Sequence, residues 1–129
     1  MLRRITVYIN DASQVHLLSS SKSPLTSYDV VAVCVSSEKL LNAVLQSDMV
    51  DIITFDMETK LPFYLKPSTV SLALQKHILF EISFNAYTSQ SNARIQFLAN
   101  FQHILFVTRG KQVGLWRWCV CAMRTRTYL

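Results

Sequence analysis

Glycine is scarce in this chain. Only two of its 129 residues are glycine, Gly110 and Gly114. A dinucleotide-binding turn or a phosphate-binding loop needs several glycines at fixed, short spacing, and these two cannot supply one. The sequence therefore excludes the usual nucleotide binders built on open α/β sheets.

Cysteine and long apolar runs are scarce as well. Three cysteines, Cys34, Cys119 and Cys121, are too few for the disulfide framework of a small secreted domain. No run of eighteen apolar residues occurs, and Asn10 and Asp11 interrupt the first apolar stretch. We therefore expect a soluble, intracellular protein with no membrane association.

The net charge of +5 is concentrated at one end of the chain. Residues 1–108 contain eight Lys/Arg and eight Asp/Glu, whereas residues 109–129 contain five basic residues and no acidic one. Basicity alone therefore does not predict that the main body binds nucleic acid. The contrast separates a charge-balanced body of residues 1–108 from a basic segment of residues 109–129.

Five short runs rich in β-branched residues recur along the body. Several of them are nearly continuous in apolar residues, as strands of a parallel sheet covered on both faces should be, and only the first comes close to the alternation of a hairpin strand. The five predicted strands are Ile5–Ile9, Asp29–Val35, Val50–Phe55, Ile78–Ser83 and Ile104–Val107.

Segments with helical periodicity lie between these runs. Each begins at a residue that favours a helix N-terminus. The first predicted helix follows Asp11 or Ser13 and buries Val15, Leu17 and Leu18. The second is Glu38–Ser47 after Ser37, and the third starts at Pro67. The fourth is Ala93–Asn100 after Ser91 or Asn92, with Ile95, Leu98 and Ala99 as its buried stripe.

Alternating strands and helices at this spacing predict an α/β fold of the barrel or open-sheet kind. A closed (β/α) barrel needs about eight strands, and this chain supplies about five. The chain therefore forms either an unusual open sheet or a piece of something larger.

Three blocks of the body resemble one protein family. They are Tyr28–Val33, Val50–Thr54 followed by Lys60-Leu-Pro-Phe-Tyr-Leu-Lys66, and Leu79–Ser83. Their order and spacing are similar to those in the thirty-kilodalton protein subunit of ribonuclease P and of the related mitochondrial-RNA-processing (MRP) ribonuclease. The resemblance runs from about Leu2 to about Val107, and Lys-Leu-Pro-Phe-Tyr is its most specific part.

The resemblance implies a TIM-like barrel related to metal-dependent phosphoesterases, without their metal site or any other cofactor. With the strands counted above, this chain would form an α/β partial TIM-like barrel with about five parallel strands, incomplete at both ends. The resemblance also implies a non-catalytic subunit that binds the ribonuclease P/MRP RNA and other protein subunits in the nucleus and nucleolus. In such a particle the RNA removes the 5′ leader of precursor tRNA, so this chain would meet precursor tRNA only indirectly. Family members have further βα units on both sides, and residues 109–129, which hold both tryptophans and both glycines, resemble nothing in the family. We therefore expect a truncated isoform, with a partial barrel domain of residues 1–108 and a divergent, irregular basic tail of residues 109–129 that comes from an alternative or read-through exon.

The resemblance and the charge pattern single out candidate RNA contacts. In a parallel barrel, functional groups lie at the carboxyl ends of the strands. Lys60 and Lys66 flank Pro62, Phe63 and Tyr64 in one such loop, where ammonium groups could meet phosphates beside a stacking ring. In the alternative interpretation both rings are buried and the lysines are merely solvated.

Arg94, Arg109 and Lys111 are candidates of second rank for phosphate contact, the last two because a strand at Ile104–Val107 would place them at the same sheet edge. Solvated surface cations are the alternative.

A different class of function, a metal-dependent phosphoesterase, would need several histidines and carboxylates that converge at strand ends. The histidines show no His-x-His pair, and Cys119-x-Cys121 is half a zinc site at best; Glu81 reads as a buried acid with a partner. The residues available for such a metal site are His16, His77 and His103 with Asp11, Asp51, Asp56 or Glu81.

A fragment without function is the third possibility, because a partial barrel leaves unpaired strand edges.

Overall fold

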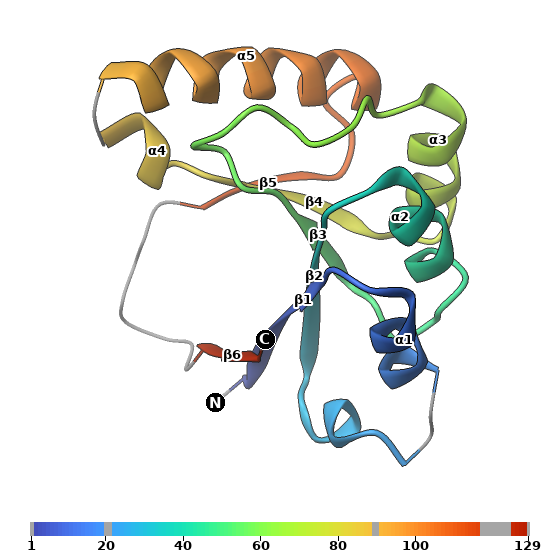
Figure 1. Ribbon diagram of the computed structural model, residues 1–129. Helices are drawn as coiled ribbons and strands as arrows, with labels where there is room; N and C mark the ends of the chain where they lie inside the picture. The colour runs from blue at the N-terminus through green and yellow to red at the C-terminus, as the bar shows by residue number, and fades with distance from the viewer. Residues whose placement is uncertain (1, 20–21, 89–90, 117–124, 129) are drawn as a thin grey trace.

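The structure, a computed structural model, describes residues 2–19, 22–88, 91–116 and 125–128. One open sheet of six parallel strands runs through it in the order β5-β4-β3-β2-β1-β6 (Figure 1). Strands β1 to β5 thus follow one another in space as they do in the chain, which is the arrangement of a TIM-like barrel left open. The strands are β1 Arg4–Ile9, β2 Val30–Val35, β3 Ile52–Thr54, β4 Leu79–Ser83, β5 Val113–Trp116 and β6 Thr125–Tyr128.

The helices begin largely where the capping residues predict. The Asp11 carboxylate caps the first helix in a capping box with Gln14, the Ser37 hydroxyl caps α2, and Pro67 opens α3. None of the helices in the described ranges is long and apolar enough to cross a membrane. The helical elements are α1 Ala12–Val15, η1 His16–Leu18, η2 Pro24–Ser27, α2 Glu38–Val44, α3 Pro67–Gln75, α4 Asn85–Thr88 and α5 Ser91–Thr108.

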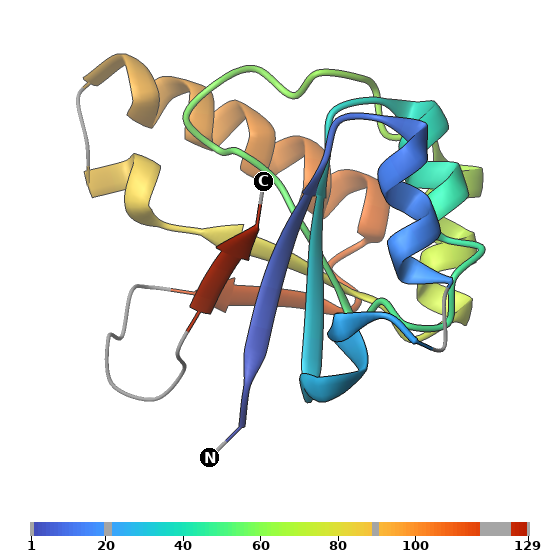
Figure 2. The ribbon, with the colours of Figure 1, turned by 60° about the horizontal axis from the view of Figure 1, so that its bottom comes forward.

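The two faces of the sheet differ in chemistry. Helices α1, α2 and α3 line one side and α5 crosses above the strands, so they all cover the same, convex face (Figures 1 and 2). Alternation along the strands turns apolar side chains toward these helices. The buried residues of that face are Ile5, Val7, Ile9, Val31, Val33, Val35, Ile53, Phe80 and Ile82.

The opposite face is concave and more polar. Its central feature is an ion pair between Arg4 of β1 and Glu81 of β4, whose guanidinium and carboxylate make two hydrogen bonds of 2.5 and 2.7 Å. Strands β2 and β3 lie between the two partners, so the sheet must curl for the side chains to meet. Both partners are buried, and the predicted buried acid with a partner at position 81 is thereby confirmed.

The prediction of a strand at Ile104–Val107 is wrong. These residues form the last turns of α5, which runs without interruption from Ser91 to Thr108. The predicted buried stripe of this helix is also wrong, since Ile95, Leu98 and Ala99 are exposed. The helix instead buries Phe97, Asn100, Ile104 and Thr108.

Two strands occupy the segment that was expected to be irregular. Strand β5 pairs with β4, and β6 pairs with β1, both in parallel. The expectation of irregular structure is therefore wrong at Val113–Trp116 and Thr125–Tyr128, and β6 covers one edge of the sheet. The division of the chain at residue 108 stays a prediction.

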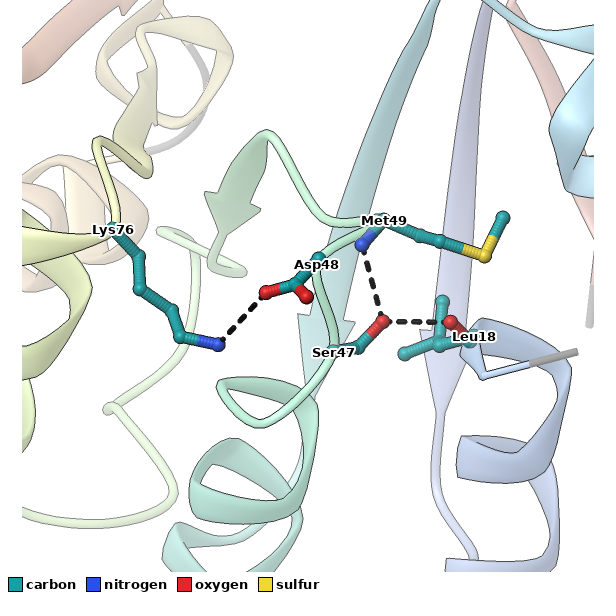
Figure 3. A network of polar contacts seen from close by, with 5 residues as sticks. All are labelled: Leu18, Ser47, Asp48, Met49 and Lys76. Atoms are coloured by element: carbon teal, nitrogen blue, oxygen red, sulfur yellow. Dashed lines mark hydrogen bonds and ion pairs between the residues drawn. The ribbon is translucent and has the colours of Figure 1, made fainter. Parts of the chain in front are cut away.

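The amino edge of the sheet is tied together by a small polar network (Figure 3). The Ser47 hydroxyl, which follows α2, donates to the carbonyl oxygen of Leu18 at 2.6 Å and accepts from the Met49 amide at 3.2 Å. Beside it, the Lys76 ammonium at the end of α3 lies 3.2 Å from the Asp48 carboxylate. The network joins three βα units on the side opposite the predicted functional edge.

Candidate nucleic-acid interface

The loop of residues 56–66 leaves β3 at the carboxyl edge of the sheet and is anchored along its length. Met57 and Leu65 are buried in the core near its two ends. The Asn100 amide of α5 donates to the carbonyl oxygen of Thr59 at 2.7 Å and to that of Met57 at 3.5 Å. Within the loop, the Asp56 carboxylate accepts from the Glu58 amide and from the Thr59 hydroxyl. The Asn100 amide thus supplies a donor to carbonyl oxygens of the loop that lie beneath α5, and these bonds together give the loop a defined shape.

This anchored loop presents a cation and an aromatic ring to solvent. Lys60 is exposed, and Tyr64 keeps 61% of its surface accessible. The Tyr64 ring lies 4.8 Å from the His103 ring of α5, measured between centroids. Phe63 is half-buried against the core, so the alternative of buried rings holds for Phe63 and not for Tyr64. An exposed ring beside a cation can stack on a base while the ammonium group meets a phosphate.

Lys66 closes the loop but is already engaged. It is the N-cap residue of α3, and its ammonium nitrogen lies 2.8 Å from the Glu38 carboxylate of α2. The pair is partly solvated, so it contributes little to stability, but it offsets the positive charge that Lys66 would offer to a phosphate. Lys60 is therefore the stronger of the two candidates.

Arg94 lies on the first turns of α5. Its Nε donates to the carbonyl oxygen of Tyr87 at 3.0 Å, and its guanidinium carbon lies 5.3 Å from the centre of the Tyr87 ring. The contact holds an exposed guanidinium over the α4–α5 junction.

Arg109 and Lys111 lie at the opposite edge from the one predicted. Because residues 104–107 are helical, these two cations fall in the turn that precedes β5, at the amino edge of the sheet. The carbonyl oxygen of Gln112 in this turn accepts from the amide of Phe80 at the start of β4. The five candidate cations therefore do not converge on one surface: Lys60, Lys66 and Arg94 follow the carboxyl ends of β3 and β4, whereas Arg109 and Lys111 lie at the amino edge.

The Cys34 thiol and the Tyr8 hydroxyl belong to paired residues near the carboxyl ends of β1 and β2, on the concave face. Burial raises the pKa of the Cys34 thiol, and the nearby Asp56 carboxylate raises that pKa further, against a smaller lowering by a backbone hydrogen bond from Asp56. The pKa of Tyr8 is raised for the same first reason, burial, and then by the charges of Cys34 and Asp56. Both groups are thus held in their neutral forms, which is the reverse of what an activated thiolate nucleophile requires.

The residues named for a metal site are dispersed. Among the residues that the structure describes, no three His, Cys, Asp or Glu side chains gather closely enough to hold a metal ion. Asp51 accepts from the backbone amide of Val31, Glu81 pairs with Arg4, and the His103 ring faces Tyr64. Cys119 and Cys121 lie outside the described residues.

Two residues that shape this region, Arg4 and Asn100, were missed in the sequence, whereas Glu81 was already expected to be a buried acid with a partner. Arg4 opens an apolar strand and Glu81 interrupts another, so two opposite charges at strand positions signalled a possible pair. Asn100, the anchor of the loop, carried no such signal, because an asparagine within a helix is usually solvated.

Comparison with known proteins resolves the family. The family model described as RNase P subunit p30 matches residues 1–115. The chain belongs to this family. The match confirms the resemblance seen in the sequence and extends it beyond Val107 into β5.

Curated relatives agree with the family. The ribonuclease P protein subunit p30 of Mus musculus is 28% identical over 115 residues, which are 89% of this chain and 43% of that protein. Protein GAMETOPHYTE DEFECTIVE 1 of Arabidopsis thaliana is 31% identical over 110 residues, 85% of this chain and 19% of that protein. The ribonuclease P/MRP protein subunit RPP1 of Saccharomyces cerevisiae is 25% identical over 126 residues, 98% of this chain and 42% of that protein. The chain spans less than half the length of each of these relatives.

Proposed function

We propose that this chain acts as a protein subunit of ribonuclease P/MRP, without catalytic groups of its own. In this role it binds the catalytic RNA and partner subunits in the nucleus and nucleolus, and it supports removal of the 5′ leader from precursor tRNA. The observation that carries the proposal is the family match over residues 1–115. The names of the mouse and yeast relatives, both subunits of ribonuclease P, point the same way.

The loop of residues 56–66 is the proposed RNA contact. Lys60 and the exposed Tyr64 ring supply the two interactions that single-stranded RNA accepts without base specificity, namely phosphate pairing and stacking. The anchors at Met57, Leu65 and Asn100 favour binding, because a loop already held in place loses little entropy when it meets RNA. Lys66, Arg94, Arg109 and Lys111 are secondary contacts in this proposal.

The test measures binding of the catalytic RNA, transcribed in vitro, to the purified chain. We expect Lys60→Ala and Tyr64→Leu each to weaken binding by about threefold to tenfold, since each removes one phosphate or stacking contact. Lys76→Ala is the matched control, because it removes one cation from the amino edge. Binding that weakens equally in the Lys60→Ala and Lys76→Ala chains would show that net charge, and not this loop, makes the contact.

Assembly is tested separately by co-purification of the tagged chain from cells. The proposal expects the catalytic RNA and other subunits of the particle to copurify. A chain that recovers neither the RNA nor the subunits does not perform the function proposed.

A further inference from the structure

Helix α5 carries an apolar stripe on the side that faces away from the sheet. Phe106 is 78% exposed, Ile95 is 69% exposed and Leu98 is 45% exposed. These three residues and the exposed Gln102 between them follow the i, i+3, i+7, i+11 spacing of one helix face, and the exposed Ala99 lies beside them.

The inner side of the same helix is already used. Phe97, Asn100, Ile104 and Thr108 are buried against the core and the loop of residues 56–66. The helix is therefore apolar on both sides, whereas a helix that borders solvent ordinarily presents charged residues there. Arg94 is the only charged residue in the eighteen positions of α5. A stripe of this kind marks a surface that another element covers.

An arginine lies near each end of the stripe, and these two positive charges indicate which kind of partner could cover it. Arg94 lies near the start of α5, Arg109 follows its last residue, and α5 contains no Asp or Glu. At 1.5 Å per residue the two arginines are about 22 Å apart along the helix. A second copy of this chain is disfavoured, since in either direction it would bring arginines close to arginines. RNA is disfavoured by the first half of the stripe, where Ile95 and Leu98 offer neither a cation to a phosphate nor a ring to a base, and where Arg94 already lies over the Tyr87 ring.

We propose that the outer face of α5 is the docking surface for an amphipathic helix of another protein subunit of the particle. The partner helix has an apolar stripe that covers Ile95, Leu98 and Phe106. It carries acidic residues at its two ends that meet Arg94 and Arg109. The identity of the partner as a particle subunit rests on the proposed function; the helix chemistry rests on α5 itself.

The experiment uses the tagged full chain and each of the other ribonuclease P/MRP protein subunits, purified separately, as probes in pairwise binding measurements. One subunit is expected to bind, and Phe106→Gln is expected to weaken that binding at least about tenfold, because exposed aromatic anchors dominate such interfaces. Leu98→Gln is compared with Leu17→Gln as a matched control. Leu17 lies in η1, away from α5, and its exposed fraction of 47% is close to the 45% of Leu98. The Leu17 variant is expected to stay within about twofold of the unchanged chain on the same scale.

A charge variant tests the ends of the surface. Arg109→Glu is expected to weaken the same complex, and the loss is expected to shrink at high salt, since screening removes exposed charge pairs. Unchanged thermal unfolding of each variant shows that the surface and not the fold was altered.

Three results would overturn the inference, and they are distinguishable. If the chain binds the catalytic RNA through Lys60 but no subunit loses affinity on Phe106→Gln, the docking surface is refuted and the proposed function stands. If Phe106→Gln instead dissolves a dimer of the chain in sedimentation measurements, a second copy occupies the face. If neither RNA nor any subunit binds, the proposed function and this inference fall together.

Discussion

Arg4 and Glu81 form a buried pair in which each charge depends on the other. Removing one partner of a buried ion pair takes away the opposite charge that offsets the burial of the other, which typically costs about 3–5 kcal/mol. We therefore expect Glu81→Gln to lower the free energy of unfolding by about that amount in urea titrations. Glu58→Gln, which removes an exposed carboxylate, is the control and is expected to change stability by less than about 0.5 kcal/mol.

The double variant Arg4→Met/Glu81→Leu separates a missing charge partner from lost packing. Because it removes both charges, it is expected to recover much of the stability lost in Glu81→Gln. A single variant as stable as the unchanged chain would contradict the burial of this pair.

The chemistry of Cys34 gives a second prediction for a single residue. Its pKa is raised by burial and then by Asp56, so at any given pH its thiolate fraction is smaller than that of a free cysteine. The rate at which iodoacetamide alkylates Cys34, measured by peptide mass spectrometry, is expected to rise at a higher pH than the alkylation rate of free cysteine. Asp56→Asn removes the carboxylate charge and keeps the backbone amide, so it is expected to move the profile toward lower pH. A profile that moves the other way would contradict the assigned effect of Asp56.

At the scale of elements, the first four strands could be predicted because each is a short apolar run that a capped or proline-started helix follows. The run Ile104–Val107 shows the limit of that reasoning, since a four-residue apolar run fits a strand and the end of a buried helix equally well. The longer context carried the information, because no glycine or proline interrupts residues 91–108. Because a strand was predicted at this run, Arg109 and Lys111 were also expected at the wrong edge of the sheet.

The loop that carries Lys60 could be located from the sequence, but its anchoring could not. Its position follows from the end of β3, whereas its shape depends on Asn100, which lies 41 residues from Thr59 in the chain. Such long-range bonds leave no periodic pattern. Strand β5 was missed for a similar reason, because Val-Gly-Leu-Trp contains a glycine that argues against a strand when read alone.

The hydrogen bonds from Asn100 of α5 to the loop of residues 56–66 predict that losing them loosens the loop more than the sheet. Asn100→Ala leaves the carbonyl oxygens of Thr59 and Met57 without their donor, and we expect a loss of stability of about 1–3 kcal/mol. Hydrogen exchange of the peptide covering residues 57–65 is expected to accelerate more than exchange in the sheet. Gln102→Ala, on the exposed face of the same helix, is the control. Equal exchange in both variants would show that the loop keeps its shape without Asn100.

At the scale of the whole molecule, the open sheet depends on its edges. Strand β6 pairs with β1 and so occupies backbone groups that an exposed edge would offer to other chains. A chain that ends after Trp116 is expected to aggregate faster, as measured by light scattering at fixed concentration. A chain with residues 117–129 replaced by a Gly/Ser segment of equal length is expected to aggregate like the shortened one. If the replaced chain behaves like the original, β6 does not protect this edge.

The pairing of Arg4 with Glu81 also has a consequence for the order in which the molecule can be made. Strands β1 to β4 are neighbours in the sheet in the order of their synthesis, so each new βα unit can add to the edge left by the one before it. Arg4 is different, because its carboxylate partner is 77 residues away and arrives only with the fourth strand. Until then the Arg4 guanidinium lacks the carboxylate to which it donates its two hydrogen bonds in the folded chain. The Arg4–Glu81 pair can therefore form only after β4 has joined, so its formation marks the assembly of the first four strands, before β5 and β6 have been made.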